Sequence, residues 1–149
     1  MSESLIKNKK AYFNYEITDK YTAGMELFGF EVKSIREKKG QLDGAYITVR
    51  GGEAYLIGAS VPAYQVANAP EDYNPLRNRR ILLTKKEIKE LSEIEAKKGL
   101  TIVAIAVYNN NRKLKLEIGI AKGKKSFDKR ESIKKRDTDR EIRRTLKNE

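Results

Sequence analysis

Three residue types are missing from this 149-residue sequence, namely histidine, cysteine and tryptophan. Without cysteine the chain has no disulfide framework, no thiolate nucleophile and no structural zinc site of the usual kind. Without histidine it lacks the commonest general base and metal ligand. We therefore expect no metal, no cofactor and no catalytic centre, although chemistry by lysine or carboxylate groups stays open.

Long apolar runs are missing as well. No segment approaches the roughly 18 uninterrupted apolar residues that a membrane-spanning helix requires. Residues 1–10 are polar and basic, and only Leu5 and Ile6 are apolar after the initiator, so no signal-peptide core is visible. We expect a cytoplasmic protein with no membrane partner.

Positive charge is the strongest feature that is present. The sequence has 32 Lys and Arg against 21 Asp and Glu, a net charge of +11. Such an excess favours an anionic partner, either a nucleic acid or a membrane surface. The alternative is a soluble protein whose charge only prevents self-association.

Apolar residues alternate with polar ones along most of the chain, which is typical of β-strands. The alternation predicts strands over residues 12–18, 26–36, 45–50, 53–61, 100–108 and 113–121. Gly51-Gly52 fits a two-residue hairpin turn that needs positive φ at both positions. Asn109 to Asn111 predicts a second hairpin, and residues 100–108 are apolar on both faces, as in a central strand.

One helix and one long loop interrupt the strands. Residues 84–98 carry a capping-box pattern of Thr84 and Glu87, an apolar stripe and a terminating Gly99. Residues 62–80 hold all three prolines and end in a basic cluster, so they predict a loop. The whole pattern predicts a mainly β fold with α content, a small closed antiparallel β-barrel of the oligonucleotide-binding-like type.

The composition changes near residue 122. Residues 122–149 contain 12 Lys and Arg and 6 Asp and Glu, a net charge of +6, and few apolar residues. We expect a barrel domain over 1–121 and a basic C-terminal tail over 122–149 that is disordered alone. Ile142 and Leu146 are spaced to form one face of a helix against a partner. The alternative is a solubilising appendage.

Catalytic motifs find no support. Charged pairs such as Glu31 and Lys33 are typical of solvated surfaces. The segment from Gly119 to Ser126 resembles a phosphate-binding loop, but it has one residue too few between its glycines.

Nucleic-acid binding is better supported, because phosphates attract clustered cations and bases stack on aromatic rings. The basic clusters are Lys7, Lys9 and Lys10; Lys33, Arg36, Lys38 and Lys39; Arg77, Arg79 and Arg80; and Lys122, Lys124 and Lys125. Tyrosines of the 62–80 loop are better stacking candidates than those on strands, which are more often core residues. These patterns do not distinguish RNA from DNA.

Several ordered motifs resemble the SsrA-binding protein (small protein B, SmpB) family. They are Asn8 to Phe13, Ala23 to Leu27, Gly29 to Arg36, Arg80 to Leu91, Ala121 to Lys125 and Asp128 to Arg130. The resemblance implies a non-enzymatic barrel with flanking helices. Its implied partners are the transfer-RNA-like domain of transfer-messenger RNA, the decoding centre and mRNA path of stalled ribosomes, and an elongation factor Tu complex. The implied role is ribosome rescue by trans-translation, performed as a monomer.

The resemblance also assigns roles to residues. The implied RNA-binding residues are Asn8, Lys9, Lys10, Glu31, Lys33, Arg36, Leu91 and Lys122; for Leu91 a core position is the alternative. The implied ribosome-facing residues are Gly123, Lys124, Lys125, Phe127, Asp128, Lys129, Arg130, Ile142 and Leu146. The family usually has histidine at the positions of Thr84 and Phe127, an aromatic residue at Thr138 and proline at Ala104.

Two other functions remain open from the sequence. A generic single-strand-binding or translation factor would share the barrel but bind oligonucleotides indifferently. A small hydrolase would use lysine or carboxylate groups, which the missing histidine and cysteine disfavour.

Overall fold

The computed structural model describes residues 4–65 and 69–123 as a mainly antiparallel β structure. The strands are β1 (Ser4–Lys7), β2 (Tyr15–Met25), β3 (Tyr46–Arg50), β4 (Glu53–Ile57), β5 (Arg79–Leu82), β6 (Leu100–Asn110) and β7 (Lys113–Gly123). The helices are α1 (Ala11–Asn14), α2 (Gly29–Arg36) and α3 (Lys85–Glu95). The predicted mainly β composition is confirmed, although the sequence pattern predicted fewer strands and one helix.

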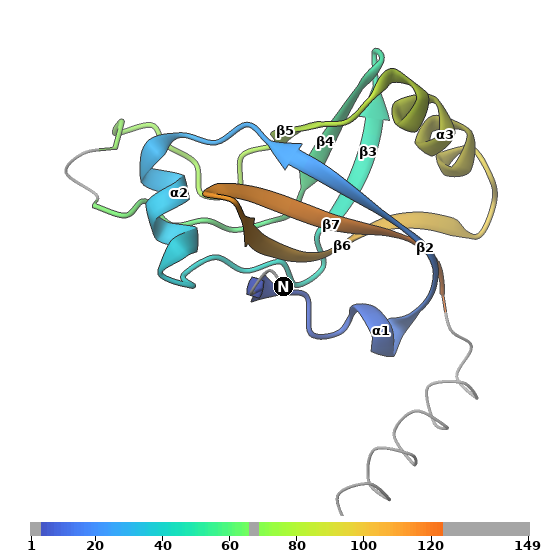
Figure 1. The fold of residues 1–149 in the computed structure, drawn as a ribbon, viewed down its shortest axis with the longest axis horizontal. Helices are drawn as coiled ribbons and strands as arrows, with labels where there is room; N and C mark the ends of the chain where they lie inside the picture. The colour runs from blue at the N-terminus through green and yellow to red at the C-terminus, as the bar shows by residue number, and fades with distance from the viewer. Residues whose placement is uncertain (1–3, 66–68, 124–149) are drawn as a thin grey trace, which may run out of the picture.

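Six strands form a closed ring of hydrogen-bonded neighbours (Figure 1). The order is β6-β3-β4-β5-β2-β7, and β7 pairs back with β6. All pairings are antiparallel, and β1 adds to β6 outside the ring. Closure protects the edges of the short strands, which is why short alternating segments predict a barrel.

The ring interior is filled by one face of each strand. Leu116 and Ile118 of β7 are completely buried, and they pack with Leu56 of β4 and Ile81 of β5. Strand β6 is buried on both faces, since Val103 belongs to a second, smaller apolar cluster outside the main core. The predicted alternation in β7 and the doubly covered central strand are therefore confirmed.

Two hairpins shape the ends of the barrel. Gly51 and Gly52 have φ of +58° and +76° between β3 and β4, as predicted for a two-residue turn. The β6–β7 hairpin also exists, but its turn is formed by Asn111 and Arg112. The turn lies later than predicted because Asn109 and Asn110 remain paired in the ladder.

Helix α3 begins as the sequence predicted. Thr84 is its N-cap and accepts the Glu87 N–H, while the Glu87 carboxylate accepts the Thr84 N–H at 3.0 Å. These bonds satisfy two of the free donors at the helix start. The helix ends at Glu95, a turn before the prediction, and Gly99 adopts φ of +86° just before β6.

The prediction of a strand over residues 26–36 is wrong, because Gly29–Arg36 is helical. Phe28, Phe30 and Val32 suggested a period of two. The buried side chains are instead Glu31, Ser34 and Ile35, at the i, i+3 and i+4 spacing of a helix face. The strand predicted from residue 12 also begins later, at Tyr15, after the short helix α1.

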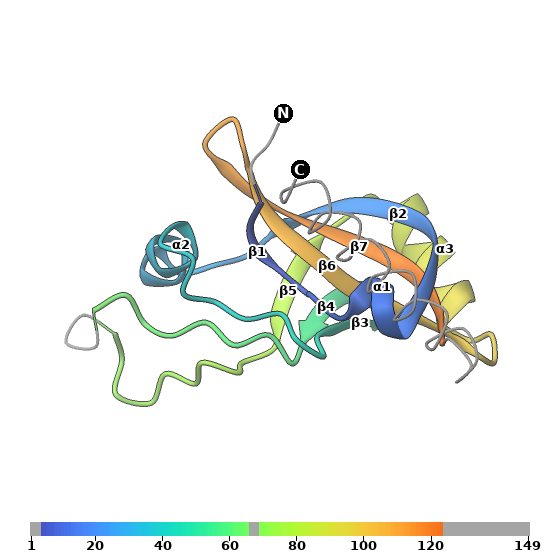
Figure 2. The ribbon, with the colours of Figure 1, turned by 90° about the horizontal axis from the view of Figure 1, so that it is seen from below.

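Helices α2 and α3 lie at opposite ends of the barrel in both views (Figures 1 and 2). The segment between β4 and β5 extends beside α2. Its predicted loop character is confirmed for the described residues 62–65 and 69–78, whereas Arg79 and Arg80 belong to β5. In the described ranges, no helix combines the length and apolar character needed to cross a membrane.

Candidate nucleic-acid interface

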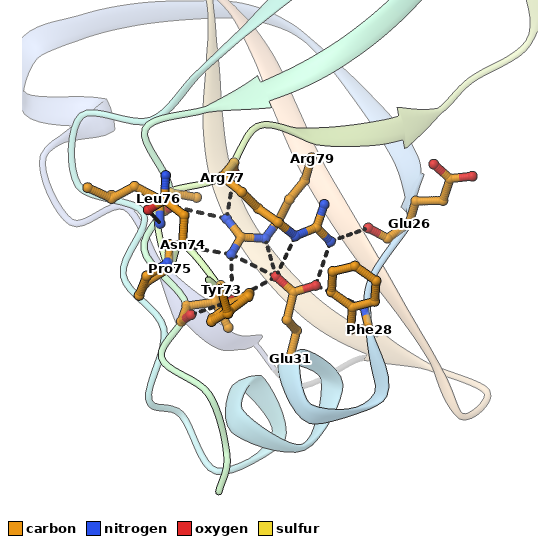
Figure 3. A network of polar contacts seen from close by, with 11 residues as sticks. Glu26, Phe28, Glu31, Tyr73, Asn74, Pro75, Leu76, Arg77 and Arg79 are labelled. Atoms are coloured by element: carbon orange, nitrogen blue, oxygen red, sulfur yellow. Dashed lines mark hydrogen bonds and ion pairs between the residues drawn. The ribbon is translucent and has the colours of Figure 1, made fainter. Parts of the chain in front are cut away.

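A buried carboxylate joins α2 to the segment before β5 (Figure 3). One oxygen of Glu31 accepts hydrogen bonds from Arg79 Nε at 2.8 Å and from the Tyr73 hydroxyl at 2.9 Å. Arg77 Nη2 donates to the other oxygen, and its Nε donates at 3.1 Å to the first. Glu31 is completely buried, so its charge depends on these partners.

Arg79 is as deeply buried as Glu31. Its Nη1 donates to the carbonyl oxygens of Ala59 and Arg77, both at 3.0 Å. Its Nη2 donates to the Pro75 carbonyl at 2.9 Å and to the Tyr73 hydroxyl at 3.1 Å. All five guanidinium N–H groups therefore have partners. The prediction of a surface cluster that includes Arg79 is wrong, because this side chain fastens the loop to the barrel.

The protein holds Glu31 in its charged form. Burial acts to raise its pKa, but hydrogen bonds from Arg77 and the Phe28 N–H, and the charge of Arg79, outweigh burial and lower the pKa. The Phe28 N–H donates at 2.8 Å, so the same carboxylate also caps the first turn of α2. Burial, followed by the hydrogen bond to Glu31, raises the pKa of Tyr73.

Aromatic rings cover this network. The Arg77 guanidinium lies 4.5 Å from the centre of the Phe28 ring, and Phe30 stacks on Phe28 at 5.4 Å between centroids. Phe30 in turn meets Tyr73 edge-on at 4.7 Å. Phe28 remains 50% exposed, so the outer ring offers an apolar edge to a partner.

The predicted N-terminal RNA-binding residues lie between β1 and the start of α1. Asn8 is 8% exposed, and its Nδ2 donates to the Ala104 carbonyl at 2.9 Å, which anchors this segment to β6. Lys9 and Lys10 are exposed beside it. Lys9 lines a hollow together with Lys7 and Lys38. Because Lys38 follows α2 closely in the chain, this hollow brings the N-terminal lysines near the cationic side chains of α2.

Lys33 and Arg36 lie one turn apart on α2. The Lys33 and Lys39 ammonium groups lie 5.8 and 5.7 Å from the centre of the Tyr64 ring. The sequence identified loop tyrosines as stacking candidates, but it did not reveal this pairing because the residues are far apart in the chain. A ring flanked by two cations can offer a stacking face and phosphate ligands together.

The remaining predicted RNA-binding and ribosome-facing residues are not found beside the cations of α2. Leu91 is completely buried in the main core, which agrees with the alternative of a core position. Lys122 is exposed near the end of β7, opposite Leu100 and Glu16, and Gly123 is the last residue of that strand. The other predicted tail residues lie outside the described residues: Lys124, Lys125, Phe127, Asp128, Lys129, Arg130, Ile142 and Leu146.

The exposed groups suit binding to an anion. They are Lys33 and Arg36 on α2, Lys39 after it, and Lys9 and Lys10 after β1, with the partly exposed Tyr64 ring beside Lys33 and Lys39 and the half-exposed Phe28 ring beside Arg77. Within residues 4–65 and 69–123, no group of three or more metal-ligating side chains comes together. We name this region, from Lys7 to Lys10 and from Lys33 to Lys39, the α2 basic surface.

The comparison with known proteins decides the family. The protein-family model described as "SmpB protein" matches residues 5–148 of this chain. The chain belongs to the SmpB family. A member from Ligilactobacillus salivarius, named SsrA-binding protein, is 48% identical over 145 residues, which cover 97% of this chain and 93% of that one. The SsrA-binding protein of Mesoplasma florum is 46% identical over 148 residues, 99% of each chain.

A solved SmpB structure is similar too. It is described as "tmRNA-SmpB: a journey to the center of the bacterial ribosome". The TM-score is 0.68 at 35% sequence identity, and the match covers 85% of this chain and 92% of that one. The names of these SmpB relatives describe binding and not a reaction, which agrees with the prediction of a non-enzymatic protein. The family resemblance predicted from the sequence is confirmed.

Proposed function

We propose that this chain binds transfer-messenger RNA through its transfer-RNA-like domain and delivers it to stalled ribosomes in trans-translation, without catalysis of its own. The observation that carries the proposal is the family match over residues 5–148, together with the similarity to a tmRNA-SmpB structure. The positive charge of the chain and the exposed cations of the α2 basic surface support it physically.

The barrel is the RNA-binding part in this proposal, as in the oligonucleotide-binding class of small barrels. The phosphate contacts are made by Lys9, Lys10, Lys33 and Arg36, and by Lys122 at the far end of β7. Glu31 and Asn8 act through the protein, since their side chains bond to arginines and to a β6 carbonyl. The Glu31 network positions α2, and Asn8 positions the lysines that follow it.

The basic tail from residue 122 forms the ribosome-facing part of the proposal. Its lysines and arginines approach ribosomal RNA in the vacant mRNA path, and Ile142 and Leu146 order as one helix face on contact. The protein works in the cytoplasm as a monomer and enters the ribosome with an elongation factor Tu complex.

Capture from total bacterial RNA tests the proposal. The full-length chain is immobilised at physiological ionic strength, and the retained RNA is sequenced. We expect strong enrichment of one structured RNA, transfer-messenger RNA. Equal retention of many unrelated RNAs would contradict the proposal and favour a generic single-strand-binding protein.

The division between barrel and tail has its own test. One full-length variant replaces Lys124, Lys125, Lys129 and Arg130 with alanine, and a second replaces Lys9, Lys10 and Lys33. We expect the tail variant to keep its RNA affinity but lose tagging on stalled ribosomes. The barrel variant, in contrast, should lose RNA affinity. Full tagging by the tail variant would refute the division of roles.

A further inference from the structure

A groove lies between α2 and the β6–β7 hairpin. Its floor is apolar and is formed by Met25, Leu27, Val32, Leu82 and Leu114. Its rim carries four cations, Arg36, Arg112, Lys113 and Lys115. Among the described residues that line it, none is acidic. Leu82 is 46% exposed, so part of the floor is open to a partner.

Arg36 ties the helix to the hairpin across this groove. Its Nη2 donates to the Arg112 carbonyl at 2.7 Å, and its Nη1 donates to Asn109 Oδ1 at 3.2 Å. These bonds fix the guanidinium at the rim and hold the hairpin tip beside α2. The groove is therefore already formed in the free protein, which lowers the cost of ordering it on binding.

The hairpin turn keeps an arginine where glycine would be easier. Asn111 and Arg112 have φ of +48° and +70°, in the left-handed region. Asparagine adopts this conformation readily, whereas in arginine it has a steric cost that is absent in glycine. The other hairpin of the barrel uses Gly51 and Gly52 at the matching positions. A strained residue that places a cation at a groove rim points to a binding role.

The charge of the rim and the apolar character of the floor together indicate what binds in the groove. Four cations with no carboxylate among the described lining residues attract a polyanion, and the apolar floor accepts the face of an unstacked base. Arg36 lies one turn from Lys33, so this groove continues the α2 basic surface around the helix. We infer that the groove holds an unpaired segment of the bound RNA, with phosphates along the rim and a base over Leu82. This inference rests on the proposed function.

Arg112→Gly in the full-length chain is the sharpest test. It removes the rim cation, relieves the backbone strain and leaves the carbonyl that accepts from Arg36. We expect unchanged or higher thermal stability, but weaker binding to the transfer-RNA-like domain. The slope of log affinity against log salt should fall in magnitude by about 1. Adding Lys113→Ala to this variant should lower the magnitude of the slope by about 1 more. The matched control is Arg50→Ala, which removes one charge beside the other hairpin.

The outcomes separate this inference from the proposed function. If the unmodified chain fails to bind the RNA, the proposed function fails first. If it binds, and Arg112→Gly binds with the same affinity and slope, the inference alone is overturned. An equal loss in Arg50→Ala would also overturn it, because the effect would then be general charge. Unchanged RNA binding with lost binding of a polyglutamate peptide would assign the groove to a protein partner and overturn it too.

Discussion

Glu31 shows how a residue can support the proposed RNA-binding surface from inside the protein. Its carboxylate caps α2 and bonds two arginines, Arg77 from the segment beside that helix and Arg79 from β5. A buried charge of this kind is stable only while all its partners remain. The network therefore fixes the position of Lys33 and Arg36 relative to the barrel, although Glu31 has no exposed surface.

Arg79→Met should lower the free energy of unfolding by about 3–5 kcal/mol, because the buried carboxylate loses a partner. Urea unfolding measures this change. Arg80→Met is the matched control on the same strand, since Arg80 pairs at the surface with Glu26 at 3.3 Å and Glu53 at 3.5 Å. Its loss should stay below about 1 kcal/mol. Equal losses in the two variants would contradict a buried network.

The pKa of Glu31 gives the network a pH signature. Because this pKa lies below its ordinary value of 4.5, the contribution of Glu31 to stability is complete above that value. It is lost as the pH falls through the lower pKa of the folded state. The unfolding free energies of the native chain and Glu31→Gln should therefore differ by a constant amount above pH 4.5 and converge as the pH falls below it. A gap that stays constant over this range would count against the assignment.

At the scale of elements, β-strands beside turns were easiest to predict. Residues 113–121 alternate strictly because one face of β7 fills the barrel. The Thr84 cap and the Gly51-Gly52 turn follow from local chemistry, so the sequence shows them directly. Helix α2 was mistaken for a strand, because its aromatic residues alternate while its buried face depends on partners distant in the chain.

Gly119 in β7 tests the packing of the second apolar cluster. A Cβ at this position would lie 2.8 Å from Ile105 Cδ1 and 2.9 Å from Ile17 Cγ2, on two sides of the strand. We expect Gly119→Ala to lower the free energy of unfolding by about 1–3 kcal/mol through overpacking. Gly123→Ala is the control, since nothing lies within 4 Å of a Cβ there, and it should change stability little. Thermal or urea unfolding that ranks the two variants in the opposite order would contradict this packing.

At the scale of the molecule, charge and closure were predictable while the interface was only partly so. Alternation and short connections favoured a closed barrel, and the net charge favoured an anionic partner. The sequence could not separate Arg79, which is buried, from Arg80, which is partly exposed, because both were assigned to the 62–80 loop. In strand β5, neighbouring residues face opposite sides. The sequence also could not place Arg112 opposite Arg36, a contact that only the folded hairpin creates.

Equilibrium binding of the full-length chain to the isolated transfer-RNA-like domain, measured from low to physiological salt, tests the central claim most directly. An unstructured RNA of equal length is the reference. We predict preference for the folded RNA at physiological salt, with a log–log salt slope of magnitude about 0.7–0.9 for each phosphate contacted. Equal affinity for the two RNAs, or binding that does not change with salt, would contradict a cationic barrel surface that recognises one shaped RNA.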